Sequence, residues 1–240
     1  MQRFWQDASV RAGNGGFAVL LDDKPMRIPG RIPGGTPLLL PNRAMADAIA
    51  GEWQAAGGEK GRTMSMNDVP LTRLAGTAQD RIAPDPAPVA DALARYAETD
   101  LLCYRASHPA PLVIRQARAW QPWLDWLART HGARLIVAEG VMHQRQDPAS
   151  LAAVQRAMAA QTPSVLAALG IAIPSLGSAV LGLALADGAL NAEAAHELGS
   201  LDELFQVELW GEDAEATRRR AGVAADVALA GRFIALSRAP

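Results

Sequence analysis

Three prolines within five residues, at positions 84, 86 and 88, divide this chain into two parts of different character. Proline has no backbone N–H and restricts the residue before it, so neither a helix interior nor a central strand can run through such a segment. It is the strongest break in the sequence and predicts a domain boundary. We therefore expect an N-terminal domain of residues 1–84 and a C-terminal domain of residues 85–240.

The first part is predicted to be rich in strands and turns. Gly13-Asn14-Gly15-Gly16 tolerates the positive φ angles of a hairpin turn between extended segments at 10–11 and 16–21. The period of apolar residues then changes to that of a helix after Asn42, which is a good N-cap. The further elements expected here are a loop at 29–35, a strand at 38–40, and helices from 43 and over 71–82.

Beyond residue 85 the sequence is almost entirely helical in character. Half of all residues are apolar but only 5% are aromatic, so alanine, leucine and valine predominate, a balance that favours helix. Asp147-Pro148 and Thr162-Pro163 each pair a capping residue with proline at the first helical position. The helices expected span 88–104, 111–130, 148–161, 163–170, 174–187, 191–210 and 213–237, with an extended piece at 134–138. The predicted fold class is α+β: a small β-rich N-terminal domain with one or two helices, followed by an all-α helical bundle.

Charge and hydropathy exclude several classes of partner. The 23 basic and 25 acidic side chains give a net charge of −2, whereas a dedicated nucleic-acid binder is expected to be basic. The most apolar stretch, 171–186, is interrupted by Pro174 and Gly177 and is shorter than the roughly 20 residues of a membrane span. The first residues lack the apolar core of a signal peptide. We expect a cytoplasmic protein with no nucleic-acid partner and no membrane insertion.

No catalytic or metal-binding constellation emerges from the sequence. The four histidines are scattered, and the single cysteine, Cys103, excludes an intramolecular disulfide and a multi-thiolate zinc site. We therefore expect no catalytic residue, no metal and no cofactor. One alternative stays open: Asp100, Tyr104 and Arg105, with Cys103, would line an inter-domain cleft that serves an enzyme or a small-ligand-binding protein, although such residues more often form an internal polar network.

Two helices carry aromatic and polar side chains at helical spacing. In the predicted helix 111–130, one stripe contains Leu112, Gln116, Trp120, Trp123 and Leu127. Two tryptophans on one stripe favour a packed core, and a binding groove is the alternative.

The second such helix ends at Trp210-Gly211. Its expected core stripe consists of Leu198, Leu201, Phe205 and Leu209. Glu208 lies at the edge of this stripe and needs a hydrogen bond, an ion pair or a raised pKa. Glu203, Gln206 and Trp210 share another face. That face could contact a protein partner or Trp210 could pack against a neighbouring helix, and spacing alone does not decide between them.

Five segments, in this order along the chain, resemble a known family. They are Arg3-Phe4-Trp5, Gly15-Gly16-Phe17-Ala18-Val19-Leu20-Leu21-Asp22, Ala48-Ile49-Ala50-Gly51-Glu52-Trp53, Thr99-Asp100-Leu101-Leu102-Cys103-Tyr104-Arg105 and Gln206-Val207-Glu208-Leu209-Trp210-Gly211. The chain is similar to the assembly chaperones of F-type ATP synthase that are specific for the alpha subunit, and it resembles a bacterial member. The similarity covers essentially the whole chain, and the last two segments are its most specific parts.

The resemblance implies a chaperone without catalytic activity. It implies binding of the unassembled alpha subunit, whose aggregation is prevented until the beta subunit displaces the chaperone. Members are cytoplasmic in bacteria and mitochondrial in eukaryotes, and a monomer suits a protein that must be displaced. The partner-binding residues it implies are Glu203, Gln206, Glu208 and Trp210, with Glu52 and Trp53 as second-rank candidates. The chain departs from the family pattern after Gly211, where its acidic run contains no histidine.

Overall fold

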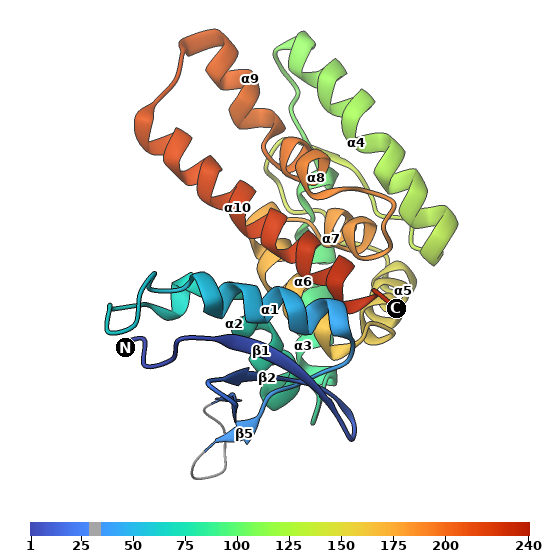
Figure 1. Ribbon diagram of the computed structural model, residues 1–240. Helices are drawn as coiled ribbons and strands as arrows, with labels where there is room; N and C mark the ends of the chain where they lie inside the picture. The colour runs from blue at the N-terminus through green and yellow to red at the C-terminus, as the bar shows by residue number, and fades with distance from the viewer. Residues whose placement is uncertain (29–34) are drawn as a thin grey trace. The chain divides into compact units, whose positions relative to one another are not determined.

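The structure, a computed structural model, describes residues 1–28 and 35–240 (Figure 1). Most of the loop expected at 29–35 therefore lies outside the described residues. The chain forms two compact units, which we call the N-terminal unit and the helical unit. The N-terminal unit consists of Met1–Pro86, Thr162–Ala168 and Arg232–Pro240, and the helical unit of Ala87–Gln161 and Leu169–Gly231. The boundary between domains after residue 84 stays a prediction.

The N-terminal unit is built on a small antiparallel sheet. Its strands are β1 (Ala8–Gly13), β2 (Gly16–Leu21), β3 (Lys24–Pro25) and β6 (Leu39–Leu40), with β4 (Arg27–Ile28) paired to β5 (Thr36–Pro37). Strand β2 is central, because β1, β3 and β6 all pair with it. The predicted hairpin turn lies between Gly13 and Gly16. Gly16 has a φ of +143° and its α-carbon faces the Leu40 carbonyl so closely that no side chain fits.

One helix covers this sheet and a second packs beside it. Helix α1 (Arg43–Ala55) lies across β1 and β2 (Figure 1), and the Asn42 side chain caps it by accepting a hydrogen bond from the Met45 N–H. Helix α2 (Pro70–Thr77) follows a 3₁₀ turn at Met66–Asp68 and continues as a π turn, Ala78–Ile82, where the sequence predicts one helix. The Trp5 indole packs against Trp53 of α1 and donates to its backbone carbonyl at 3.0 Å.

A buried arginine closes the end of α1. The Arg3 side chain is only 4% exposed, and its guanidinium donates to main-chain carbonyls. Those carbonyls belong to Trp5, Gln6, Gln54, Ala56 and Gly58. The last carbonyls of a helix have no partner within the helix and carry partial negative charge, so a cation here satisfies them.

The helical unit contains the remaining elements. Its helices are α3 (Ala87–Ala94), α4 (Ala110–His131), α5 (Pro148–Ala159), α7 (Ala179–Ala186), α8 (Ala192–Gly199) and α9 (Leu201–Trp210). Two 3₁₀ turns, Arg95–Thr99 and Leu101–Cys103, lie between α3 and α4. Helices α6 (Pro163–Leu176) and α10 (Ala214–Ser237) contribute residues to both units. All eight residues of α7 are buried, so this helix forms the centre of the unit.

Three departures from the predicted helices have local causes. Helix α6 continues through Pro174 and ends at Gly177, whose φ is +64°, and Ser178 then caps α7. The predicted helix 191–210 breaks at Ser200, next to Gly199, which packs closely against the Leu176 side chain. The predicted helix 88–104 is interrupted by 3₁₀ turns.

A two-residue pair of parallel strands is embedded in the helical unit. Strand β7 (Tyr104–Arg105) pairs with β8 (Ala138–Glu139), which lies at the end of the extended piece expected at 134–138. The predicted fold class, α+β with a small β-rich N-terminal region and a helical remainder, is confirmed, with this pair as an addition to the helices. None of the helices described within residues 1–28 and 35–240 has the length and apolar character needed to cross a membrane.

Replacing the buried guanidinium should destabilise the N-terminal unit selectively. We expect Arg3→Met to lower the free energy of unfolding by about 3 kcal/mol, since it leaves several buried carbonyls without donors. Urea denaturation measures the change, and Arg62→Met, at an exposed arginine, is the matched control. A loss in Arg3→Met no larger than in the control would contradict this role.

Candidate functional site

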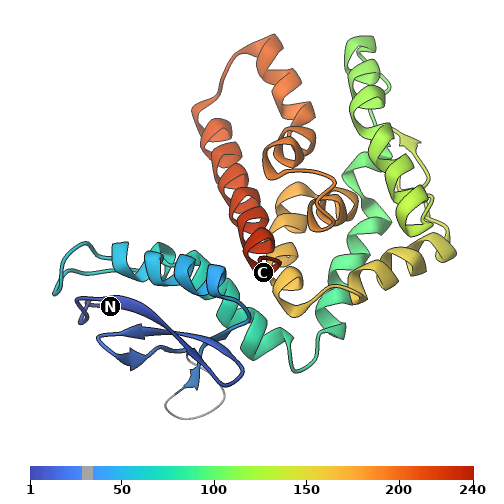
Figure 2. The same ribbon diagram turned by 45° about the vertical axis from the view of Figure 1, so that its right-hand side comes forward.

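The residues of interest lie where α4 and α9 meet. Figures 1 and 2 both show the N-terminal end of α4 and the C-terminal end of α9 at the same end of the helical unit. Arg115 of α4 donates two hydrogen bonds to the Glu208 carboxylate, at 2.6 and 2.8 Å. Nearly two turns earlier on α9, Asp202 accepts a hydrogen bond at 2.7 Å from Gln116. Polar side chains therefore tie the two helices together.

The ion pair gives Glu208 the partner that its position on the helix requires. The hydrogen bond from Arg115 holds the pKa of the Glu208 carboxyl below its usual range and raises the pKa of Arg115. The guanidinium also lies 5.2 Å from the centre of the Phe205 ring. The Glu208 side chain nevertheless stays 55% exposed, so the carboxylate can accept a further donor from outside the chain.

The opposite face of α9 carries the other predicted residues. Glu203 lies 3.1 Å from Arg219 and 3.9 Å from Arg220 of α10, and Gln206 is exposed. Trp210 is 78% exposed, so it is not packed against a neighbouring helix. A hollow of about 290 Å³ runs between α9 and α10 beside it. Its lining residues are Glu203, Gln206, Val207, Trp210, Gly211, Glu212, Asp213, Ala216, Arg219 and Arg220.

Leu209 was expected in the core and is exposed, so this expectation is wrong. The rest of the stripe is covered: Leu201 and Phe205 are buried and Leu198 is half-buried. Leu209 lies in the last turn of α9, just before the helix ends at Gly211. No described element covers that turn, so Leu209 and Trp210 form an exposed apolar pair.

Gln116, Arg115 and Asp202 join α4 to α9, and the sequence assigned no role to any of the three. Gln116 is buried, and its two amide atoms bridge two segments: the oxygen accepts from the Ala106 N–H at 2.8 Å and the nitrogen donates to Asp202. A glutamine on an apolar stripe beside Trp120 was the available signal. Arg115 and Asp202 had no such signal, because each is an ordinary charged residue on a helix.

Arg115 also borders an apolar hollow on α4. This hollow has a volume of about 630 Å³ and is lined by Ala110, Pro111, Ile114, Arg115, Arg118 and Ala119. Ile114 is exposed within it. Apolar surface thus lies on the α4 side of the Arg115–Glu208 pair and, through Leu209 and Trp210, at the end of α9.

Glu52 and Trp53 occupy a different place and have structural partners. The Glu52 carboxylate accepts hydrogen bonds from the Leu71 and Thr72 N–H groups at 2.7 and 3.1 Å, which caps α2. Burial raises the pKa of Glu52 despite these bonds. Trp53 is buried and donates to the Thr72 hydroxyl at 2.8 Å. This pair joins α1 to α2. It belongs to the N-terminal unit, whereas the α9 residues belong to the helical unit.

Asp100 forms a buried polar network within the helical unit. Its carboxylate accepts hydrogen bonds from the Leu102 N–H at 3.1 Å, the Ser178 hydroxyl at 2.8 Å and the Val180 N–H at 3.0 Å. The bonds to Leu102 and Val180 cap a 3₁₀ turn and α7. Desolvation by burial raises the pKa of Asp100 to about 6, and the hydrogen bonds act in the opposite direction.

The neighbours of Asp100 are equally occupied. Burial raises the pKa of the Cys103 thiol to about 12, so little nucleophilic thiolate forms near neutral pH. Arg105 donates to the Leu102 carbonyl at 2.7 Å and stacks on Trp120, although its Nη2 atom is buried without a hydrogen bond. The Tyr104 hydroxyl lies 3.3 Å from His143. This set therefore resembles the internal polar network more than a reactive centre.

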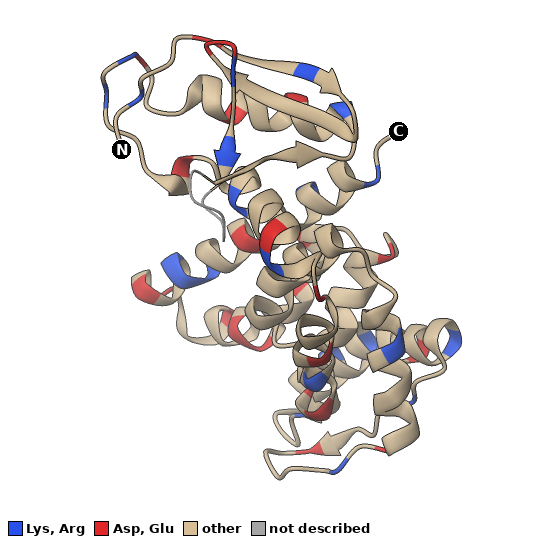
Figure 3. Cartoon of the chain, turned by 90° about the horizontal axis from the view of Figure 1, so that it is seen from below, with Lys and Arg blue, Asp and Glu red and all other residues tan. Residues whose placement is uncertain are grey.

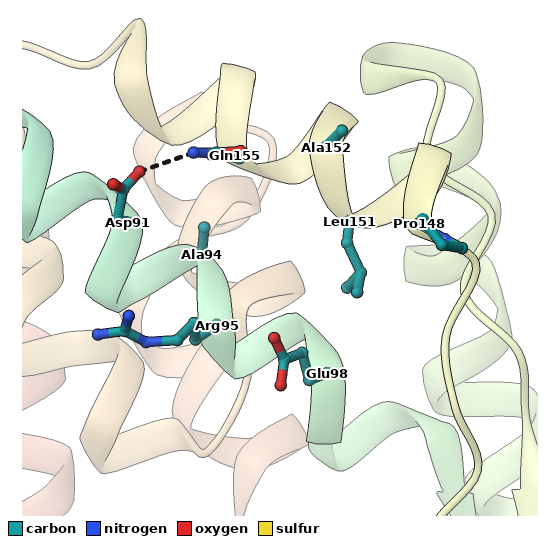
Figure 4. Close-up of a pocket in the computed structure, with 8 residues that line it drawn as sticks. All are labelled: Asp91, Ala94, Arg95, Glu98, Pro148, Leu151, Ala152 and Gln155. Carbon is teal, nitrogen blue, oxygen red and sulfur yellow. Dashed lines mark hydrogen bonds between the residues drawn. The ribbon is translucent and has the colours of Figure 1, made fainter.

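Figure 4 shows a hollow of about 390 Å³ on the helical unit. It lies between α5 and the segment formed by α3 and the 3₁₀ turn after it. Its lining residues are Asp91, Ala94, Arg95, Glu98, Pro148, Leu151, Ala152 and Gln155. Asp91 accepts a hydrogen bond from Gln155 at 2.9 Å. Its charged side chains are exposed and of mixed sign, and they include no nucleophile with an adjacent base.

Charge is distributed without a dominant patch. Figure 3 shows basic and acidic positions interspersed along the chain, as the net charge of −2 suggests. Among the described residues, no three histidine, cysteine or acidic side chains come together in a group that could hold a metal ion. The exposed surface of α9 is thus distinguished by its apolar pair and the carboxylates beside it.

Comparison with known proteins gives a consistent result. A family model described as ATP12 chaperone protein matches residues 2–128. Atp12 from Paracoccus denitrificans is 41% identical, with a TM-score of 0.90 over 99% of this chain and 98% of that chain. A substitution mutant of P. denitrificans Atp12p has 40% identity and a TM-score of 0.89 with the same coverage. Atu1473 of Agrobacterium tumefaciens, described as a candidate chaperone, has 41% identity and a TM-score of 0.85 over 97% of this chain and 84% of that chain.

The buried carboxylate predicts a pH dependence of stability opposite to that of a salt-bridged acid. The folded protein holds the Asp100 proton more tightly than the unfolded chain does, because the pKa of this carboxyl is raised on folding. Protonation of Asp100 therefore contributes its full share to the free energy of unfolding below about pH 3.8, and this share is lost as the pH rises through about 6. We expect the stability advantage of the wild type over Asp100→Asn to be larger at pH 5 than at pH 7 by about 1 kcal/mol. Urea denaturation at both pH values measures it, and an equal advantage would contradict the raised pKa.

Proposed function

Because this chain belongs to the ATP12 chaperone family, whose members act in the assembly of ATP synthase, we propose that it binds the unassembled alpha subunit and prevents its aggregation until the beta subunit displaces it. A free subunit exposes the apolar surface that its neighbour will later cover, and such surface promotes self-association. A chaperone that covers it must itself present apolar groups to solvent. We propose that it does so as a monomer, in the cytoplasm of a bacterium, and without catalysis.

One observation carries this proposal: Trp210 is 78% exposed at the end of α9. Exposing an indole has a cost in water, and tryptophan is among the residues that contribute most to binding at protein interfaces. Leu209 beside it is also exposed, and the polar side chains of Glu203, Gln206 and Glu208 lie on the same helix. An apolar centre within a polar rim is the usual composition of a protein contact.

The charged rim suits a contact that must be reversible. Glu203 and Glu208 already have arginine partners within the chain, yet each side chain keeps more than a third of its surface exposed. A basic group of the client can therefore bind either carboxylate without leaving an unpaired buried charge when it departs. Exposed ion pairs contribute little affinity, so the apolar pair supplies most of the binding energy and the rim supplies selectivity.

Glu52 and Trp53 take a supporting role in this proposal. Trp53 is buried and the Glu52 carboxylate is occupied by the N-terminus of α2, so neither offers a free group to a partner. We propose that they maintain the N-terminal unit in its folded form. Their substitution would then act through stability, whereas substitutions on α9 would act through binding.

Reversing the charges of the Arg115–Glu208 pair by substitution tests whether Glu208 contacts the partner or only stabilises the fold. We expect Glu208→Lys to abolish the recovery of soluble alpha subunit on co-expression, because it removes the carboxylate and breaks the Arg115 pair. The double variant Glu208→Lys/Arg115→Glu restores an ion pair with reversed charges. It should regain the thermal stability of the wild type but still fail to recover the alpha subunit.

The controls make this experiment decisive. Glu193→Lys, at an exposed glutamate of α8, should leave the recovery of the alpha subunit unchanged. Recovery by the double variant would mean that Glu208 acts only through Arg115 and would remove it from the contact. If the alpha subunit stays insoluble even with the wild-type chain, and no complex survives purification, the proposed function is wrong.

Removal of the exposed indole should affect binding and not folding. We expect Trp210→Ser to weaken binding of the alpha subunit by about 2 kcal/mol, roughly thirtyfold in Kd, since it removes the largest exposed apolar side chain of α9. Calorimetric titration of the purified proteins measures the change. The midpoint of thermal unfolding should shift little, and an unchanged Kd would exclude Trp210 from the contact.

A further inference from the structure

A second exposed apolar element lies outside α9, in the segment between α4 and α5. Val141 is 93% exposed and Met142 is 79% exposed, and only Gly140 separates them from β8. Scattered apolar residues on a surface are ordinary, but two adjacent side chains that are almost fully exposed at the tip of one loop are not. Neither residue was distinguished by the sequence, because no periodic pattern includes them.

The base of this loop is held by specific hydrogen bonds. The side-chain amide of Gln146, which is buried, accepts from the Ile136 N–H at 2.7 Å and donates to the Ile136 carbonyl at 3.0 Å. On the other side, β8 pairs with β7, and the Gly140 N–H donates to the Arg105 carbonyl at 2.8 Å. Because hydrogen bonds hold the two ends of the loop together, its tip has a defined position. Less conformational entropy is then lost when the tip binds a partner.

The loop is connected to α9 through a short chain of contacts. Arg105 accepts the hydrogen bond from Gly140, and the next residue, Ala106, donates its N–H to Gln116. Gln116 in turn donates to Asp202 of α9. The loop and α9 are therefore attached to the same part of α4, at Arg115 and Gln116.

We propose that Val141 and Met142 form a second anchor for the client that α9 contacts, and this inference rests on the proposed function. The occupant is an apolar depression on the surface of the alpha subunit. Two apolar side chains on a fastened loop fit such a depression, and an unbranched methionine adapts to its shape. Two separated anchors let each contact remain modest while their sum retains the client, and release can begin at either one.

The test compares binding of the purified alpha subunit by the wild-type chain and by Val141→Ser/Met142→Ser. We expect the double variant to bind at least tenfold more weakly with an unchanged thermal midpoint, since both side chains are exposed. Met66→Ser, at an exposed methionine of the N-terminal unit, is the matched control and should bind like the wild type. In hydrogen exchange of the wild-type complex, the amides of residues 140–143 should become protected.

The outcomes distinguish this inference from the function on which it rests. If the wild type binds the alpha subunit, but the double variant binds within twofold of it and residues 140–143 gain no protection, the second anchor is wrong and the proposed function stands. If the wild type does not bind, both are wrong. If the wild type self-associates on size-exclusion chromatography and the double variant does not, the tip is a contact between copies of this chain, and the inference is overturned.

Discussion

The helical unit depends on one buried carboxylate, that of Asp100. It accepts hydrogen bonds at the start of α7, where N–H groups have no partner within the helix and no access to water. Helix α7 is buried along its whole length, and α4 packs against it. Helix α4 carries Arg115 and Gln116, which hold α9. The buried core around α7 therefore determines the position of the proposed contact surface.

The join between α4 and α9 differs in kind from the core that supports it. Gln116 is buried and fixes Asp202, whereas Arg115 and Glu208 form their pair at the surface and remain open to competing groups. A buried polar link specifies one arrangement of the helices, while an exposed ion pair contributes little energy and exchanges readily. This division suits a protein that must keep its own shape while it holds and then releases a partner.

Local chemistry accounts for much of the fold and part of the candidate site. The hairpin at Gly13–Gly16, the cap at Asn42 and the start of α5 after Asp147 are all encoded within a few residues, and each was predictable. The helix breaks at Ser178 and Ser200 were not, because packing of Gly199 against Leu176 and the bond from Ser178 to Asp100 involve residues far apart in the sequence. The pairing of β7 with β8 was missed for the same reason.

By itself, the sequence determined the fold class and, through the resemblance of its motifs, the family. It also indicated that Glu208 requires a partner, because a carboxylate at the edge of an apolar stripe cannot remain unpaired. Only the tertiary structure identified that partner as Arg115, moved Leu209 from the core to the surface and exposed Val141 and Met142. Periodicity reports which faces of a helix are alike, but which face is covered depends on where neighbouring elements end, and that is decided by contacts between distant parts of the chain.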